Sequence, residues 1–168
     1  NRSIAYHSKV MREEQRRNIG QIQKAELDSA ACQEEFHQLA KKHYFALRKI
    51  KDSQHRHAEL IYRRIIGEIM NEEEGHCDHA KLAVTTLLLA LHCQRMGDLK
   101  KTRSVFLSFV RVVVVENDND EKECACSAKV LGAYALFEMK QGNELKSLEI
   151  ARKAVQFDRS SEPVLQWK

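Results

Sequence analysis

The sequence contains very few of the residues that interrupt helices. It has one proline and six glycines among 168 residues. Because proline breaks a helix interior and glycine supplies the backbone freedom of tight turns, this scarcity leaves little room for a turn-rich chain. Charged residues make up 31% of the chain, which suits the solvent faces of long amphipathic helices. The composition therefore predicts an all-α fold.

Long apolar runs and charged tails are missing as well. The apolar runs are short, such as Leu87–Leu91 and Val112–Val115, whereas a signal peptide needs 7–15 apolar residues and a membrane span about 20. The 28 basic and 24 acidic residues are spread along the chain. Five scattered cysteines, an odd number, indicate reduced thiols. We expect an intracellular protein, cytoplasmic or nuclear, with no membrane contact.

Residues 1–75 read as a segment of long helices. A polar helix with a thin apolar stripe is predicted over residues 9–27, and Asp28 and Ser29 supply an N-cap for the next one. Further apolar residues then recur at helical spacing, namely Phe36, Leu39, Ala40, Leu47, Ile50, Ile61, Ile65 and Ile69. One long helix or two shorter helices that break near Asp52 and Ser53 both fit this pattern. Gly75 is the expected terminator.

Residues 76–168 read as shorter helices in a second segment, packed together with the first. We predict helices over 82–96, 99–115, 124–140 and 144–157. Gly97 and Gly142 mark two turns, with Asp98 and Asn143 as the N-caps that follow them. Asp120 and Glu123 have the form of a capping box. The regular pattern is expected to end at Ser160–Pro163.

Two helix-turn-helix units 45 residues apart appear when Gly97 is aligned with Gly142. The aligned pairs on either side of the glycines are Leu89-Ala90 with Tyr134-Ala135, Asp98-Leu99-Lys100 with Asn143-Glu144-Leu145, Phe106 with Ala151, and Phe109 with Ala154. Small residues let antiparallel helices approach, and glycine permits the tight turn between them.

These residues resemble the tetratricopeptide repeat, and the unit around Gly142, which ends in Ala154–Asp158, is the closer match. The spacing of 45 residues differs from the 34 of that family, and Val114 and Arg159 stand where its closing proline is usual. The resemblance covers about residues 78–159. It implies an antiparallel helical array with a concave surface that binds a peptide or helix of another protein.

A basic ladder is the most distinctive feature of the first segment. Lys42, Lys49, Arg56 and Arg63 recur every seven residues, with Tyr62 among the aromatic residues interleaved. On one continuous helix, seven residues are two turns, so these charges would form a single ridge. The ridge could meet an acidic partner helix or follow nucleic-acid phosphates. Together with Trp167 in the terminal tail, these five residues are the candidate partner contacts.

Other chemistry is weakly indicated. His76, Cys77 and His79 with Cys124 and Cys126 could ligate zinc, although Cys-x-Cys on a helix directs its sulfurs apart. Glu34-x-x-His37 and Glu73-x-x-His76 look superficially like ligands of di-iron bundles. His43 and His57 could fix the register of a helix seam or reach water at its edge. We expect neither metal nor cofactor and no enzyme activity.

The sequence thus predicts a non-catalytic protein-protein interaction module, an adaptor or scaffold that binds a partner helix or peptide. Self-association is a version of the same hypothesis, because weak helical seams often complete their cores by pairing. The alternative is a nucleic-acid-binding helical module that uses the basic residues between positions 41 and 64.

Overall fold

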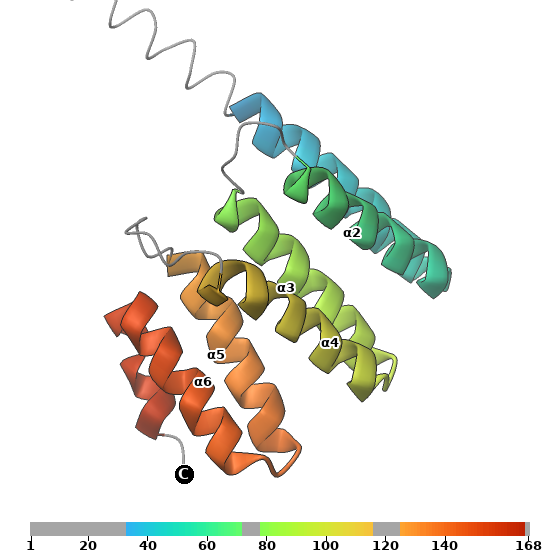
Figure 1. The fold of residues 1–168 in the computed structure, drawn as a ribbon. Coiled ribbons are helices and arrows are strands. Elements are labelled where there is room, and N and C mark those ends of the chain that lie inside the picture. Colours follow the sequence, from blue (N-terminus) through green and yellow to red (C-terminus); the bar gives the residue numbers. More distant parts are fainter. Residues whose placement is uncertain (1–32, 72–77, 116–124, 167–168) are drawn as a thin grey trace, which may run out of the picture. The chain divides into compact units, whose positions relative to one another are not determined.

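The computed structural model describes residues 33–71, 78–115 and 125–166, and every regular element in these ranges is a helix (Figure 1). The predicted all-α fold is confirmed. The chain divides into two compact units, residues 1–41 and 42–168. In the first unit, residues 33–41 are helical, and the Gln38 amide donates to the Glu34 carboxylate at 2.6 Å. The predicted helix at 9–27 and the caps at Asp28 and Ser29 lie outside the described ranges.

The second unit begins with a helical hairpin. Its first arm, residues 42–51, is helical and ends at a turn in which Ser53 has a φ of 60°, and α2 (His55–Met70) follows. The rings of His43 and Tyr62 lie 6.1 Å apart, and Lys42 reaches Glu68, so residues 42–51 run antiparallel to α2. Of the two alternatives for this region, two shorter helices form.

α2 ends earlier than the sequence suggested. Its last residue is Met70, and the backbone N–H of Asn71 donates to the carbonyls of Gly67 and Glu68. The prediction that this helix ends at Gly75 is wrong, because the backbone hydrogen bonds of Asn71 already close the last turn. The predicted segment boundary between residues 75 and 76 lies in an undescribed stretch and stays a prediction.

Two helix-turn-helix units follow. The first comprises α3 (His79–Arg95) and α4 (Leu99–Val110), and the second comprises α5 (Ala125–Lys140) and α6 (Glu144–Phe157). Gly97 and Gly142 join the helices with φ values of +75° and +77°, the left-handed region that glycine enters freely. As predicted, Asp98 caps α4 by accepting from the Lys101 N–H at 3.0 Å. The predicted capping box at Asp120 and Glu123 lies outside the described ranges.

Two helix ends differ from the prediction. After Val110 the chain continues as a π-helical turn, η1 (Arg111–Val115), instead of an α-helix. After Phe157 a 3-10 helix, η2 (Arg159–Gln166), runs through Pro163 instead of ending the regular structure. An Asx-type turn starts it, because the Ser160 N–H donates to the Asp158 carboxylate at 2.9 Å.

Helix α5 lies at the centre of the packing. It contacts α3, α4, α6 and η2, while α2 packs on α3 (Figure 1). The rings of Phe106, Tyr134 and Phe137 form an aromatic core between α4 and α5, with centroids 4.9–6.5 Å apart. The positions aligned in the two units are buried alike, namely Leu89, Ala90, Phe106 and Phe109 in the first and Tyr134, Ala135, Ala151 and Ala154 in the second.

The two turn glycines should be required for their backbone conformation alone. A Cβ at Gly97 or Gly142 meets no atom within 4 Å, so alanine costs only the strain of a left-handed residue. We expect G97A and G142A each to lower the free energy of unfolding by about 1 kcal/mol in urea denaturation. Gly132→Ala, in the interior of α5 and equally free of clashes, should instead raise it by about 0.5–1 kcal/mol. Equal effects at all three positions would contradict this account.

Candidate functional site

A groove of about 290 Å³ lies where α2, α3 and α4 meet. Its lining residues are Arg63, Ile66, Gly67 and Met70 from α2, Leu82, Thr86 and Leu89 from α3, Ser104, Val105, Ser108 and Phe109 from α4, and Val112 from η1. Leu82, Leu89 and Phe109 are buried and form an apolar floor, whereas Ser104 and Ser108 are exposed at the rim. The groove can therefore receive an apolar side chain while its rim stays hydrated.

Gly67 leaves room in this groove. A Cβ added to Gly67 would meet no atom within 4 Å, although the residue lies on a helix packed against α3. The absence of a side chain at this position therefore opens space between α2 and α4. A glycine in a helix interior lowers stability relative to alanine. At this position, the glycine in return leaves part of the groove empty.

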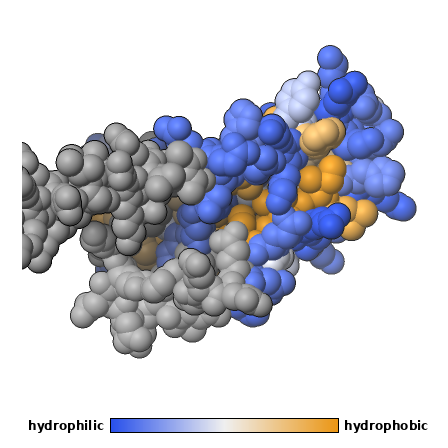
Figure 2. All heavy atoms as spheres, turned by 90° about the horizontal axis from the view of Figure 1, so that it is seen from above, coloured by the Kyte–Doolittle hydropathy of each residue, from blue (hydrophilic) through white to orange (hydrophobic). Residues whose placement is uncertain are grey.

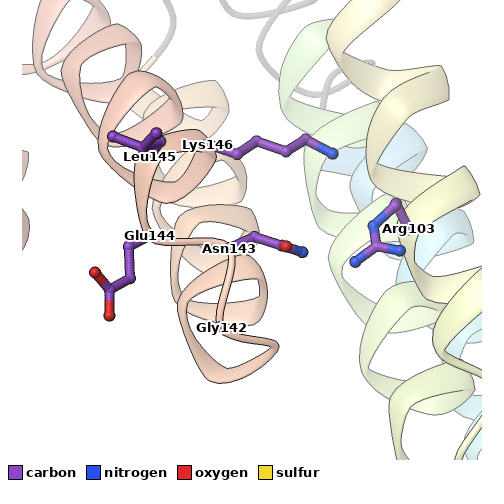
Figure 3. Close-up of a pocket in the computed structure, with 6 residues that line it drawn as sticks. All are labelled: Arg103, Gly142, Asn143, Glu144, Leu145 and Lys146. Atoms are coloured by element: carbon purple, nitrogen blue, oxygen red, sulfur yellow. The ribbon is translucent and has the colours of Figure 1, made fainter.

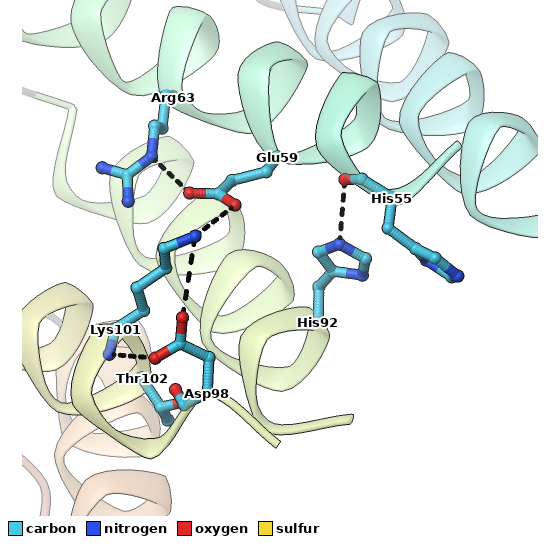
Figure 4. A network of polar contacts seen from close by, with 7 residues as sticks. All are labelled: His55, Glu59, Arg63, His92, Asp98, Lys101 and Thr102. Carbon is cyan, nitrogen blue, oxygen red and sulfur yellow. Dashed lines mark hydrogen bonds and ion pairs between the residues drawn. The ribbon is translucent and has the colours of Figure 1, made fainter. Parts of the chain in front are cut away.

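A polar network connects α2 to α4 beside the groove (Figure 4). The Glu59 carboxylate accepts from Arg63 Nε at 2.9 Å and from Lys101 Nζ at 3.1 Å, and Lys101 Nζ also lies 3.6 Å from Asp98. Burial alone would raise the pKa of Glu59, but the hydrogen bonds from Arg63 and Lys101 lower it. The network fixes the distance between the helices that form the groove walls.

The predicted basic ladder does not form one ridge. The turn at Asp52–Gln54 reverses the chain, so Lys42 and Lys49 lie on the first arm of the hairpin and Arg56 and Arg63 on α2. Seven-residue spacing aligns side chains only along an unbroken helix. Lys42 pairs with Glu68 at 2.5 Å and Arg63 with Glu59 at 2.9 Å. Two of the four cations are therefore already neutralised by α2.

The other predicted contacts take different positions. Tyr62 is 1% exposed and packs in the core beside His43, so its ring does not face solvent as expected for a partner contact. Trp167 lies outside the described ranges. The two histidines of the predicted seam separate: His57 is exposed, whereas His43 is buried. Because the Thr85 hydroxyl donates to the Lys81 carbonyl, His43 Nε2 must donate to Thr85 Oγ1, at 3.0 Å.

Metal ligation has no support in the described ranges. These residues contain no cluster of three or more His, Cys, Asp or Glu side chains placed to hold an ion. Asp78 serves as the N-cap of α3, accepting from the Ala80 and Lys81 N–H groups. His76, Cys77, Cys124 and Glu73 of the predicted zinc and di-iron sets lie outside the described ranges.

The most strongly built polar cluster surrounds Glu138, a residue that the sequence reasoning missed. Its carboxylate is fully buried and accepts from Arg103 Nε and Nη2 at 2.7 and 2.9 Å, Lys146 Nζ at 2.9 Å and Asn143 Nδ2 at 2.6 Å. Burial alone would raise its pKa, but these hydrogen bonds outweigh burial and hold the pKa at about 2. The repeat alignment contained a signal, because Glu138 aligns with the buried Cys93.

Comparisons of the chain with protein-family models, with curated proteins and with solved structures find no match. Among the described helices, none combines the length and the apolar character needed to cross a bilayer.

Glu138 should dominate the acid sensitivity of the fold. Because its pKa falls from 4.5 unfolded to about 2 folded, its contribution is complete above pH 4.5 and is lost as the pH falls toward 2. We expect E138Q to lower the free energy of unfolding at pH 7 by about 3 kcal/mol and to flatten its decline between pH 4.5 and 2. Urea denaturation across this pH range measures both effects.

Glu144→Gln is the matched control, since Glu144 is exposed and the substitution removes the same charge. It should change the free energy of unfolding by no more than about 0.5 kcal/mol. An E138Q variant with the stability and pH profile of E144Q would refute the role assigned to the buried carboxylate.

Proposed function

We propose that this chain is a non-catalytic protein-protein interaction module, an adaptor or scaffold that binds a helix or peptide of a partner protein. The observation that carries the proposal is the groove between α2, α3 and α4, with its buried apolar floor and exposed polar rim. Anchoring side chains at protein interfaces fill pockets of this kind, and a surrounding polar rim excludes water from them.

The size of the groove favours a side chain presented by a partner over an independent small molecule. At about 290 Å³ it stands at the lower limit of small-molecule sites, which run from about 300 to 1,000 Å³. A partner helix or extended segment can place one large apolar residue in such a space while its backbone stays outside. The resemblance of the two helix-turn-helix units to the tetratricopeptide repeat supports the same class of partner.

Exposed apolar side chains extend this proposal to self-association. On one face, hydrophobic residues gather between hydrophilic ones (Figure 2). Tyr44, Phe45 and Leu60 are each about 60% exposed, at 62%, 59% and 62%. Large apolar side chains that stay exposed are candidates for contact with a second copy of the chain. Cys93 is a buried thiol that forms no disulfide, which supports an intracellular location, cytoplasmic or nuclear.

Filling the groove should abolish partner binding without harming the fold. In Gly67→Leu the new side chain occupies the open space beside Gly67, so the free energy of unfolding should stay constant or rise by about 1 kcal/mol. We expect proteins retained from cell extract by the wild-type chain to be reduced at least about tenfold. Quantitative mass spectrometry of the retained proteins, with sedimentation for self-association, measures this loss.

Gln156→Leu is the control, because it places an equally apolar side chain on an exposed position of α6 outside the groove. It should retain the same proteins as the wild type. Partners captured equally well by G67L and Q156L would mean that the groove is not the binding site.

A test for nucleic-acid binding, the alternative function, should be negative. The split ladder and the ion pairs of Lys42 and Arg63 leave no continuous basic ridge on the hairpin. Titration with short RNA and DNA duplexes at about 50 and about 200 mM salt should show no salt-sensitive binding. Affinity that falls steeply with salt and disappears in a Lys49→Gln, Arg56→Gln double variant would establish the alternative instead.

A further inference from the structure

A second pocket, separate from the groove, lies between α4 and the turn that joins α5 to α6. Its volume is about 630 Å³, and it is lined by Arg103, Gly142, Asn143, Glu144, Leu145 and Lys146. Arg103 comes from α4, and its guanidinium faces Asn143 and Lys146 across the pocket, while the Glu144 carboxylate points away (Figure 3). Three of the lining side chains, those of Arg103, Asn143 and Lys146, are thus hydrogen-bond donors, and two of them are cationic. Their nitrogens converge on the buried Glu138 carboxylate.

The buried Glu138 carboxylate holds these donors in place without using all of them. Arg103 donates its Nε hydrogen and one Nη2 hydrogen to Glu138. The two Nη1 hydrogens and the second Nη2 hydrogen remain available to donate to a ligand. Lys146 donates one of its three ammonium hydrogens to Glu138. The three ionised groups together carry one net positive charge. Arg103 is also fixed over the Phe137 ring, and Lys146 over the Tyr134 ring.

The first turn of α6 adds backbone donors to the same pocket. Asn143 occupies the N-cap position, but its side chain makes no cap and donates to Glu138 instead. The N–H groups of Glu144, Leu145 and Lys146 therefore lack the side-chain acceptor that Asp98 gives α4.

We propose that the pocket lined by Arg103, Asn143 and Lys146 binds the dianion of a phosphate monoester. A ligand in this pocket would meet donors on several sides. The Arg103 guanidinium lies on one wall, the Lys146 ammonium group on the other, and the N–H groups of the first turn of α6 lie beside them. The oxygens of a tetrahedral phosphate can accept hydrogen bonds from all of these donors at once. A planar carboxylate has only two oxygens, which the two parallel N–H groups of a single guanidinium already occupy. Because the buried Glu138 fixes the cations beforehand, the pocket loses little side-chain entropy when it binds. This inference does not depend on the groove.

The direct test uses the full chain without mutation. In ¹⁵N-resolved NMR at pH 7.5, inorganic phosphate should shift the N–H resonances of Leu145 and Lys146 and the Arg103 Nε–H resonance, in a saturable manner. The capped first turn of α4, Leu99–Lys101, is the internal control and should not shift. Chloride at equal ionic strength should not reproduce the effect. Shifts that are absent, that chloride reproduces, or that acetate produces equally would overturn the proposal.

Two lysine variants test whether phosphate binding is specific to this pocket. Lys146→Gln should weaken phosphate binding at least about tenfold, as expected for the loss of one charge-assisted hydrogen bond. Lys153→Gln removes the same charge from an exposed position of α6 outside the pocket, and should bind phosphate like the wild type. Equal weakening in both variants would contradict a specific site. The thermal midpoint of each variant separates lost binding from lost folding.

The source of the phosphate can be distinguished with the same resonances. A phosphoserine peptide that binds more tightly than inorganic phosphate identifies a phosphorylated partner segment as the ligand. Binding of inorganic phosphate alone identifies a free small anion and still supports the site. If neither probe binds wild-type protein that is folded by its NMR spectrum, the proposal is wrong, whatever the outcome for the groove.

Discussion

The carboxylate of Glu138 is the interaction on which the C-terminal half of the structure depends. It belongs to α5, yet its hydrogen-bond donors come from α4, from the turn after α5 and from α6. A buried carboxylate without partners would cost several kcal/mol. The three elements therefore cannot separate from α5 without exposing or abandoning this charge. That constraint sets the position of the α5–α6 turn and the direction of two cationic side chains.

Helix α4 connects the two candidate sites. Ser104, Val105, Ser108 and Phe109 form one wall of the apolar groove, while the neighbouring Arg103 faces the polar pocket. Its first turn is held at Lys101 by Glu59 of α2. Because ion pairs of Lys101 with Glu59 and of Arg103 with Glu138 tie the N-terminal part of α4 to α2 and α5, α4 presents an apolar and a cationic surface in a fixed arrangement. A partner lying across α4 could contact both.

Local signals predicted the helices and turns well, but not the placement of charge. The glycine turns at 97 and 142 and the cap at Asp98 follow from backbone chemistry that operates within a few residues. The ladder from Lys42 to Arg63 failed because it assumed an unbroken helix, and nothing as decisive as glycine or proline marks the break at Ser53. The groove depends on how α2 packs against α3, which no local pattern encodes. Glu138 was predictable only through its alignment with Cys93.

That alignment also explains why equivalent lysines make different contacts. Lys101 and Lys146 hold the same position in the first turn of the second helix of each unit, 45 residues apart. In the second unit the lysine finds Glu138 on the preceding helix. In the first unit Cys93 stands at that position, so Lys101 turns to Glu59 of the neighbouring hairpin. The residue at this one position, Cys93 or Glu138, thus decides whether the lysine pairs within its own unit or with the neighbouring hairpin, and in the second unit a cationic pocket lies at the turn.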